Sequence, residues 1–249
     1  MMTTFIWTFA GIVGAIAIVH WIRTGQPVWA RLGVSRTALL PDCAAGVGIG
    51  ALVMAGIFVV HLLLAQIRMV EAAADTSTAL AMIPVLLGLA LLEEVVFRSL
   101  MLNGLIVLLT RGESLKREDR IKREALAVLI SALLFGVAHM SNPGASVLSV
   151  ISNALGGVMY SLAFLGTRRL WLPLGLHFAW NYFQGPVFGF LVSGLDFGGL
   201  FSHITIGSVL LTGGDYGPEG GLIGIGFRFI VMGLILVWCR RASSQPDLT

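Results

Sequence analysis

The sequence predicts an all-α, polytopic helical membrane protein, and three observations support this fold class. The chain of 249 residues is 57% hydrophobic and 12% charged, whereas soluble domains contain about 25% charged residues. Its mean hydropathy is +0.90. Apolar runs that approach the roughly 20 residues needed to cross a bilayer recur from end to end. We therefore expect one membrane domain over residues 1–249, with no separate soluble domain.

The hydropathy pattern predicts about seven transmembrane helices. They cover residues 4–22, 43–67, 79–110, 124–140, 145–166, 171–193 and 222–239. The first has no basic region before it and no small-residue cleavage site, so we expect an uncleaved span and not a signal peptide. The third is longer than a crossing requires, so we expect it to tilt or to project. The sixth contains Gly185-Pro186, where we expect the helix to break.

The distribution of lysine and arginine predicts the orientation of these spans. Thirteen of the 16 basic residues fall in alternate loops and in the C-terminal segment. They are Arg23, Arg31, Arg36, Arg111, Lys116, Arg117, Arg120, Lys122, Arg123, Arg168, Arg169, Arg240 and Arg241. Only Arg68 lies on the opposite side, while Arg98 and Arg228 lie inside spans. By the positive-inside rule the N-terminus is outside and the C-terminus inside. We expect a multi-pass protein of the cell (inner) membrane. The positive charge reports topology and does not indicate a nucleic-acid partner.

Polar signatures interrupt three of the predicted spans. They are EExxxR at 93–98, FxxxH at 135–139 and HxxxN at 177–181. A charged side chain at the centre of a bilayer costs about 2.5–3.5 kcal/mol even on lenient scales, so such residues face protein or water and commonly have a function. Residues four apart share one face of a helix. Each signature can therefore direct its side chains toward one point between the helices.

The carboxylates of the first signature have different expected roles. Glu94 and Arg98 are four residues apart and can form an ion pair, which lowers the cost of burying them. Glu93 points about 100° away around the helix and has no cation nearby in the sequence. A carboxylate removed from water is a better proton acceptor, so Glu93 is a candidate general base. Taken singly, a Glu–Arg pair can be a structural clamp, a histidine a helix–helix hydrogen bond, and an asparagine polar glue.

In this order and setting, the three motifs resemble those of the CAAX-protease and bacteriocin-processing (Abi) family of intramembrane endopeptidases. This family includes the type II CAAX prenyl endopeptidases. The resemblance covers a catalytic core at residues 80–185. The external stretch Gly213–Gly221 also resembles a loop of some bacterial members, although a glycine- and proline-rich turn explains it without a function.

The resemblance implies a role for each matching residue. Glu93 and His139 polarise the attacking water, while His177 and Asn181 hold the oxyanion that forms on the scissile carbonyl. Glu94 and Arg98 organise the site. Phe135, the first residue of the second motif, is expected to pack and to fix the helix face that bears His139.

A metal ion is the open alternative for the chemistry. Glu93, His139 and His177 have the ligand types of a catalytic zinc site. However, the chain has no HExxH motif, and each candidate ligand comes from a different span. We favour water activation by Glu93 and His139 with no metal or other cofactor.

The function expected from the sequence is hydrolysis of a peptide bond in a membrane-tethered peptide or protein. From the short chain we expect a bacterial protein, and bacteria generally lack prenylation, so the family name does not define the substrate. Two other classes of function remain. A non-catalytic scaffold or regulator of a membrane partner would tolerate loss of Glu93. An ion- or proton-coupled transporter is disfavoured because the chain has no internal repeat and, apart from Glu124 and Arg228, no further charges in its other spans.

Overall fold

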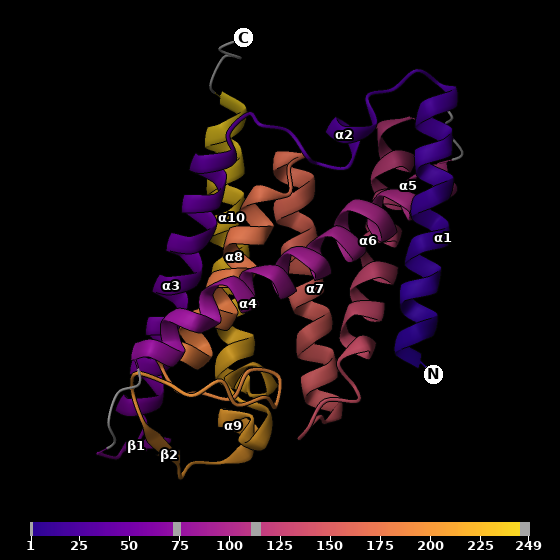
Figure 1. Ribbon diagram of the computed structural model, residues 1–249. Helices are drawn as coiled ribbons and strands as arrows, with labels where there is room; N and C mark the ends of the chain where they lie inside the picture. The colour runs from indigo at the N-terminus through magenta and orange to yellow at the C-terminus, as the bar shows by residue number, and fades with distance from the viewer. Residues whose placement is uncertain (1, 72–75, 111–115, 245–249) are drawn as a thin grey trace.

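The computed structural model describes residues 2–71, 76–110 and 116–244, and these form a bundle of helices with a cap at one end (Figure 1). The long helices are α1 (Met2–Arg23), α3 (Leu39–Leu63), α4 (Thr76–Glu94), α6 (Arg117–Ala138), α7 (Val147–Thr167), α8 (Trp171–Tyr182) and α10 (Leu222–Ser244). Shorter helices are α2 (Val28–Arg31), α5 (Asn103–Thr110) and α9 (Val209–Thr212). These helices confirm the mainly helical fold.

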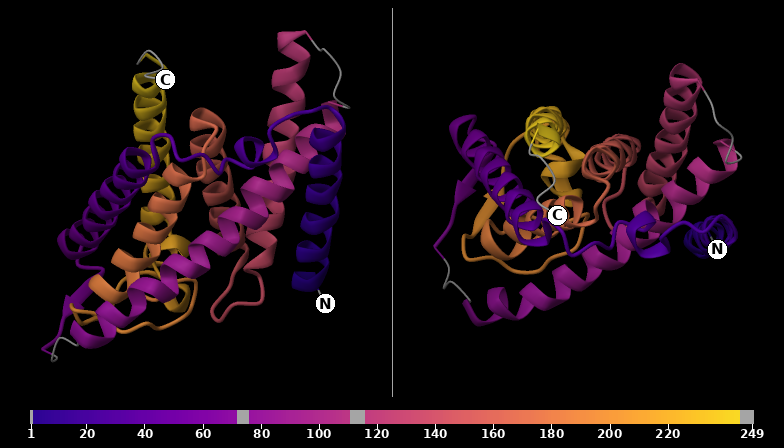
Figure 2. Two further views of the ribbon diagram at one scale, coloured as in Figure 1. Left: turned by 45° about the horizontal axis from the view of Figure 1, so that its top comes forward. Right: turned by 90° about the horizontal axis from the view of Figure 1, so that it is seen from above.

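The predicted third span is a composite helix. After α4 the chain continues as a π-helix, η1 (Val95–Leu102), and then as α5. Together they run obliquely across the bundle (Figure 2), in agreement with the expected tilt. Pro84 lies inside α4. The π-helix was not predicted, and it replaces the regular α-helical spacing assumed for the first motif.

The cap consists of residues 188–221 and follows a second π-helix, η2 (Phe183–Val187). The expected break at Gly185-Pro186 occurs, since the helical segment that begins at Trp171 ends with η2 at Val187, short of residue 193. The cap contains strand β2 (His203–Thr205), which pairs antiparallel with β1 (Ile67–Met69). It also contains α9 and the 3₁₀ turns η3 (Gly214–Tyr216) and η4 (Pro218–Gly220).

Within the described residues, five helical segments are long and apolar enough to cross a membrane, which is fewer than the seven predicted. They are Thr4–Arg23, Leu39–Leu63, Thr76–Thr110, Val147–Thr167 and Leu222–Arg241. The other two candidates are α6, whose first turns are highly charged, and α8, which has only 12 residues. The apolar part of α6 begins after Glu124 and spans about 21 Å, which is less than the hydrocarbon core. The number seven and the orientation stay predictions.

Small residues pack two of the helices that carry the polar motifs closely against their neighbours. Gly46 and Gly50 of α3 face α8, and a Cβ at Gly46 would lie 2.4 Å from the Leu172 carbonyl oxygen. Gly136 of α6 faces α7, where a Cβ would lie 2.4 Å from the Val150 carbonyl oxygen. Spacing of small residues by four allows helix backbones to approach closely in membranes. These contacts fix α8 and α6, which position His177 and His139.

Candidate active site

Glu94 and Arg98 form a buried ion pair where α4 changes into the π-helix η1. Their side chains are 0% and 1% exposed, and Arg98 Nε lies 3.3 Å from Glu94 Oε2. Arg98 also donates a hydrogen bond from Nη2 to the Gly157 carbonyl oxygen (3.2 Å). Its guanidinium carbon lies 4.6 Å from the centre of the Phe135 ring and 5.2 Å from that of Tyr160. The predicted ion pair therefore forms, on a π-helical turn of the kind frequently found at functional sites.

His177 is held by this ion pair and by an aromatic ring. Its Nδ1 lies 2.7 Å from Glu94 Oε1. The imidazole is stacked on Tyr160, with the ring centres 4.6 Å apart and an angle of 16° between the planes. Because an ionised carboxylate only accepts hydrogen bonds, Nδ1 is the donor. Nε2 is then the ring nitrogen directed at Glu93, whose Oε2 lies 3.8 Å away.

His139 reaches the same carboxylate from another helix. It lies directly after the last residue of α6, and not within the helix as predicted. Its Nδ1 lies 2.8 Å from the Phe135 carbonyl oxygen, and since a carbonyl can only accept, Nδ1 carries the proton. Nε2 of His139 therefore faces Glu93 Oε2, which is 3.9 Å away. Phe135 is buried with its ring centre 4.7 Å from that of His139, as expected for a packing residue.

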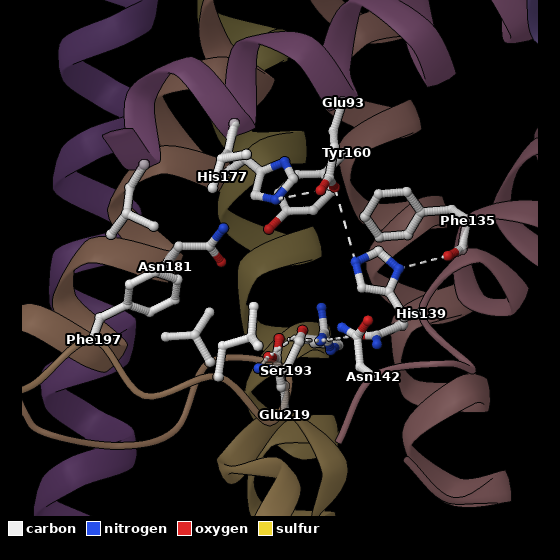
Figure 3. Close-up of a pocket in the computed structure, with 16 residues that line it drawn as sticks. Glu93, Phe135, His139, Asn142, Tyr160, His177, Asn181, Ser193, Phe197 and Glu219 are labelled. Carbon is white, nitrogen blue, oxygen red and sulfur yellow. Dashed lines mark hydrogen bonds and ion pairs between the residues drawn. The ribbon is translucent and has the colours of Figure 1, made fainter. Parts of the chain in front are cut away.

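Glu93, His139, His177 and Asn181 line one cavity of about 90 Å³ (Figure 3). Asn181 projects into it from α8, one turn after His177. The Glu93 side chain is 27% exposed, and its Oε2 makes no hydrogen bond to the described residues. Glu94 and Arg98 lie behind His177 and do not line the cavity. The six predicted residues thus separate into four that face the cavity and two that support them.

The cavity is also lined by polar residues that the sequence analysis did not select. They are Asn142, Asn153, Tyr160, Ser193, Glu219 and Arg228. Two sequence signals were present, since Arg228 lies inside an apolar run and Glu219 lies in the Gly213–Gly221 loop. Ser193 and Asn153 carry no comparable signal, because only the fold of the cap and the packing of α7 bring them to the cavity.

The three candidate metal ligands lie close together at the cavity, and the expected absence of a metal stays a prediction. Tetrahedral zinc with bonds of about 2.0–2.2 Å holds its donor atoms about 3.4 Å apart. Glu93 Oε2 lies 3.8 and 3.9 Å from the two histidine nitrogens. Across the described ranges, no group of three or more His, Cys, Asp or Glu residues could hold a metal ion.

The fold and the cavity together define a helical membrane protein with an acid–histidine cluster buried among its helices. Residues 75–183 match the family described as Type II CAAX prenyl endopeptidase Rce1-like, whose members are proteases. The match covers the part of the chain that bears the three motifs, and it confirms the predicted resemblance to the CAAX-protease and bacteriocin-processing family. No curated protein and no solved structure gives a significant match to the chain.

Proposed function

We propose that this protein is an intramembrane endopeptidase that hydrolyses a peptide bond in a membrane-tethered peptide or protein. The single observation that carries the proposal is the position of Glu93. Its Oε2 lies within 3.9 Å of Nε2 of both His139 and His177, at a cavity that also receives Asn181. A base for water and donors for an oxyanion are the two requirements of peptide hydrolysis.

Glu93 and His139 activate the water. A water between Glu93 Oε2 and the His139 Nε2 lone pair has an acceptor on each side. As its oxygen attacks the scissile carbonyl carbon, its proton passes to this pair. When the C–N bond breaks, the same pair returns the proton to the leaving amine. The products are a carboxylic acid, which ionises, and an amine.

His177 and Asn181 stabilise the oxyanion of the tetrahedral intermediate. Asn181 donates through its side-chain amide. Because the Nδ1 proton of His177 is directed to Glu94, His177 donates through Nε2 only when both ring nitrogens are protonated. Glu94 then supplies the counter-charge, and Arg98 fixes Glu94. Such preorganised donors are commonly worth about 10²–10³ in kcat each.

The substrate reaches the cavity past apolar side chains. Leu86, Leu89, Leu195 and Phe197 line the cavity beside Glu93, and Leu89 and Leu195 are exposed. An apolar entrance suits a membrane-tethered segment of a peptide or protein. Leader peptides and membrane regulators of a bacterial inner membrane are substrates of this class. The bilayer is then the second partner of the protein.

The experiment uses the full chain in lipid with a library of membrane peptides and detects cleavage by mass spectrometry. We expect wild type to cleave, and both Glu93→Gln and His139→Ala to lose cleavage by at least about 10²-fold, the lower range for general acid–base catalysis. Glu124→Gln is the matched control, because Glu124 pairs with Arg120 and Arg168 away from the cavity.

A chelator arm tests the proposal that no metal is required. Cleavage by wild type should persist after treatment with EDTA and with 1,10-phenanthroline. Loss of cleavage that added zinc restores would contradict this point. Cleavage by Glu93→Gln at the wild-type rate would contradict the mechanism. A wild type that cleaves nothing, with a host phenotype rescued by Glu93→Gln, would favour the scaffold.

A further inference from the structure

A second buried ion pair lies across the cavity from the first. Arg228 of α10 and Glu219 of η4 are 2% and 4% exposed, and Arg228 Nη2 lies 3.7 Å from Glu219 Oε2. Arg228 lies within a candidate membrane span. Burying two charges costs several kcal/mol per ion in proteins, so stability alone is a weak reason for such a pair. The position of this ion pair at the cavity suggests a role in the function of the site.

Glu219 also contacts residues outside this ion pair. Its Oε1 accepts hydrogen bonds from the Ser193 hydroxyl (2.7 Å), from the Ser193 backbone nitrogen and from Gln184 Nε2 (3.3 Å). Its other oxygen faces Arg228. Both carboxylate oxygens are therefore occupied. Glu219 therefore joins Ser193 and Gln184 to Arg228.

Arg228 is oriented by α7. Its Nε lies 3.2 Å from Ser152 Oγ and its Nη2 3.4 Å from Asn153 Oδ1. Gly156 leaves room for the guanidinium, since a Cβ there would lie 2.3 Å from Nη1. Asn153 in turn donates to the Tyr216 hydroxyl. Burial raises the pKa of Tyr216, so its phenol stays neutral and can accept this bond. The guanidinium plane is thus set by contacts on several sides.

The face of the guanidinium rests on α8, the helix that carries His177 and Asn181. The Arg228 guanidinium carbon lies 4.8 Å from the centre of the Trp180 ring. Trp180 is 1% exposed and is adjacent in sequence to Asn181. The indole nitrogen of Trp180 has no hydrogen-bond partner among the described residues. Packing, including the contact with Arg228, therefore holds the indole in place.

We propose that Arg228 is a positioning residue that acts through Trp180 to hold the α8 turn bearing His177 and Asn181 at the cavity. The inference rests on the proposed function, because it assigns those two residues to the oxyanion. Arg228 lines the cavity yet is committed to Glu219, Ser152, Asn153 and Trp180. A displacement of the donors by about 1 Å is enough to cost about 10²-fold in rate.

The test is a double-mutant cycle of Arg228→Met and Trp180→Leu, with kcat and KM measured on a peptide that wild type cleaves. Each single variant should lower kcat by about 10- to 100-fold and leave KM within about twofold. Since both act through one contact, the double variant should be no slower than the slower single variant. Trp180→Leu removes the stacked ring without removing a hydrogen bond.

Control variants separate positioning from loss of folding. Arg169→Met breaks a comparable contact at Asp42, where Arg169 Nε lies 2.6 Å from the carboxylate and Trp238 also donates. It should lower the unfolding temperature and keep kcat within about threefold, because this cluster does not line the cavity. If Arg228→Met does not fold, Glu219→Gln combined with Arg228→Met removes both charges and should fold, with kcat still reduced.

Four results would overturn the inference. Two are a wild-type kcat in Arg228→Met or in the Glu219→Gln/Arg228→Met variant. The third is a loss of kcat in the Arg228→Met/Trp180→Leu variant that equals the product of the two single losses, and the fourth is an equal loss of kcat in Arg169→Met. Glu93→Gln separates these from failure of the proposed function. If wild type cleaves and Glu93→Gln does not, an unchanged Arg228→Met defeats only the inference. If wild type cleaves nothing, or Glu93→Gln cleaves as wild type does, both fail together.

Discussion

At the scale of single residues, the neighbours Glu93 and Glu94 have opposite environments. Glu94 is fully buried and contacts both His177 and Arg98. Glu93 is partly exposed, and its Oε2 lacks a hydrogen-bond partner among the described residues. An uncompensated buried charge is strongly destabilising, whereas a carboxylate at a cavity can be neutralised with little effect on folding. Two adjacent glutamates should therefore respond differently to the same substitution.

Glu94→Gln should lower the free energy of unfolding by about 3–5 kcal/mol, because it leaves Arg98 buried without a counter-charge. Glu93→Gln should change it by less than about 1 kcal/mol, while both variants lose cleavage. Denaturant titration of each purified variant in the same detergent measures this difference in the free energy of unfolding. Equal stability losses in the two variants would contradict the division between a supporting and a reacting carboxylate.

The candidate site was only partly predictable from its residues. The EExxxR, FxxxH and HxxxN spacing named four of the polar residues that line the cavity and the two behind them. It did not predict that Glu94 would contact His177, because that bond joins residues 83 positions apart. Nor did it place His139 beyond the end of α6, since helix ends depend on local capping and the turn that follows. Long-range contacts of this kind are set by packing.

At the scale of elements, the contact between α3 and α8 depends on the absence of side chains. Gly46 faces the Leu172 carbonyl oxygen, whereas a Cβ at Gly48 would meet nothing within 4 Å. Gly46→Ala should push α8 away from α3, destabilise the protein by about 1–3 kcal/mol and lower kcat by displacing His177. Gly48→Ala is the matched control, which should be neutral or stabilising by up to about 1 kcal/mol.

Unfolding and cleavage assays on the two glycine variants check this prediction. If Gly46→Ala is as stable and as active as Gly48→Ala, the close approach of the two helices does not position the site. The GxxxG spacing of Gly46 and Gly50 was readable in the sequence. The sequence did not predict that α8 packs against this spacing, because hydropathy gives the length of a helix and not its neighbours.

At the scale of the whole molecule, α6 and α8 cross the bundle although neither meets the length and composition of a span. At one end, the turn after α6 lies against the cap, where a Cβ at Gly144 would lie 2.8 Å from the Asp215 backbone. At the other end, Leu170 donates to the Gly33 carbonyl oxygen, and Arg168 lies 3.7 Å from Glu124. Five of the described helical segments are long and apolar enough to span a membrane. We predict seven crossings, in which neighbouring helices shield α6 and α8.

Seven crossings and five make different predictions for Ser141, in the turn after α6. With seven crossings, Ser141→Cys faces outward, whereas with five it stays on the inner side. We expect Ser141→Cys to react with a membrane-impermeant maleimide added to intact cells, in a Cys43→Ala/Cys239→Ala background. Asp196→Cys in the cap should also react, and Thr37→Cys should react only after the membrane is opened. Asp196→Cys and Thr37→Cys lie on the same side of the membrane whether the chain crosses it five or seven times. Protection of Ser141→Cys alone would therefore contradict seven crossings. Reaction of Thr37→Cys in intact cells with protection of Asp196→Cys would instead reverse the predicted orientation.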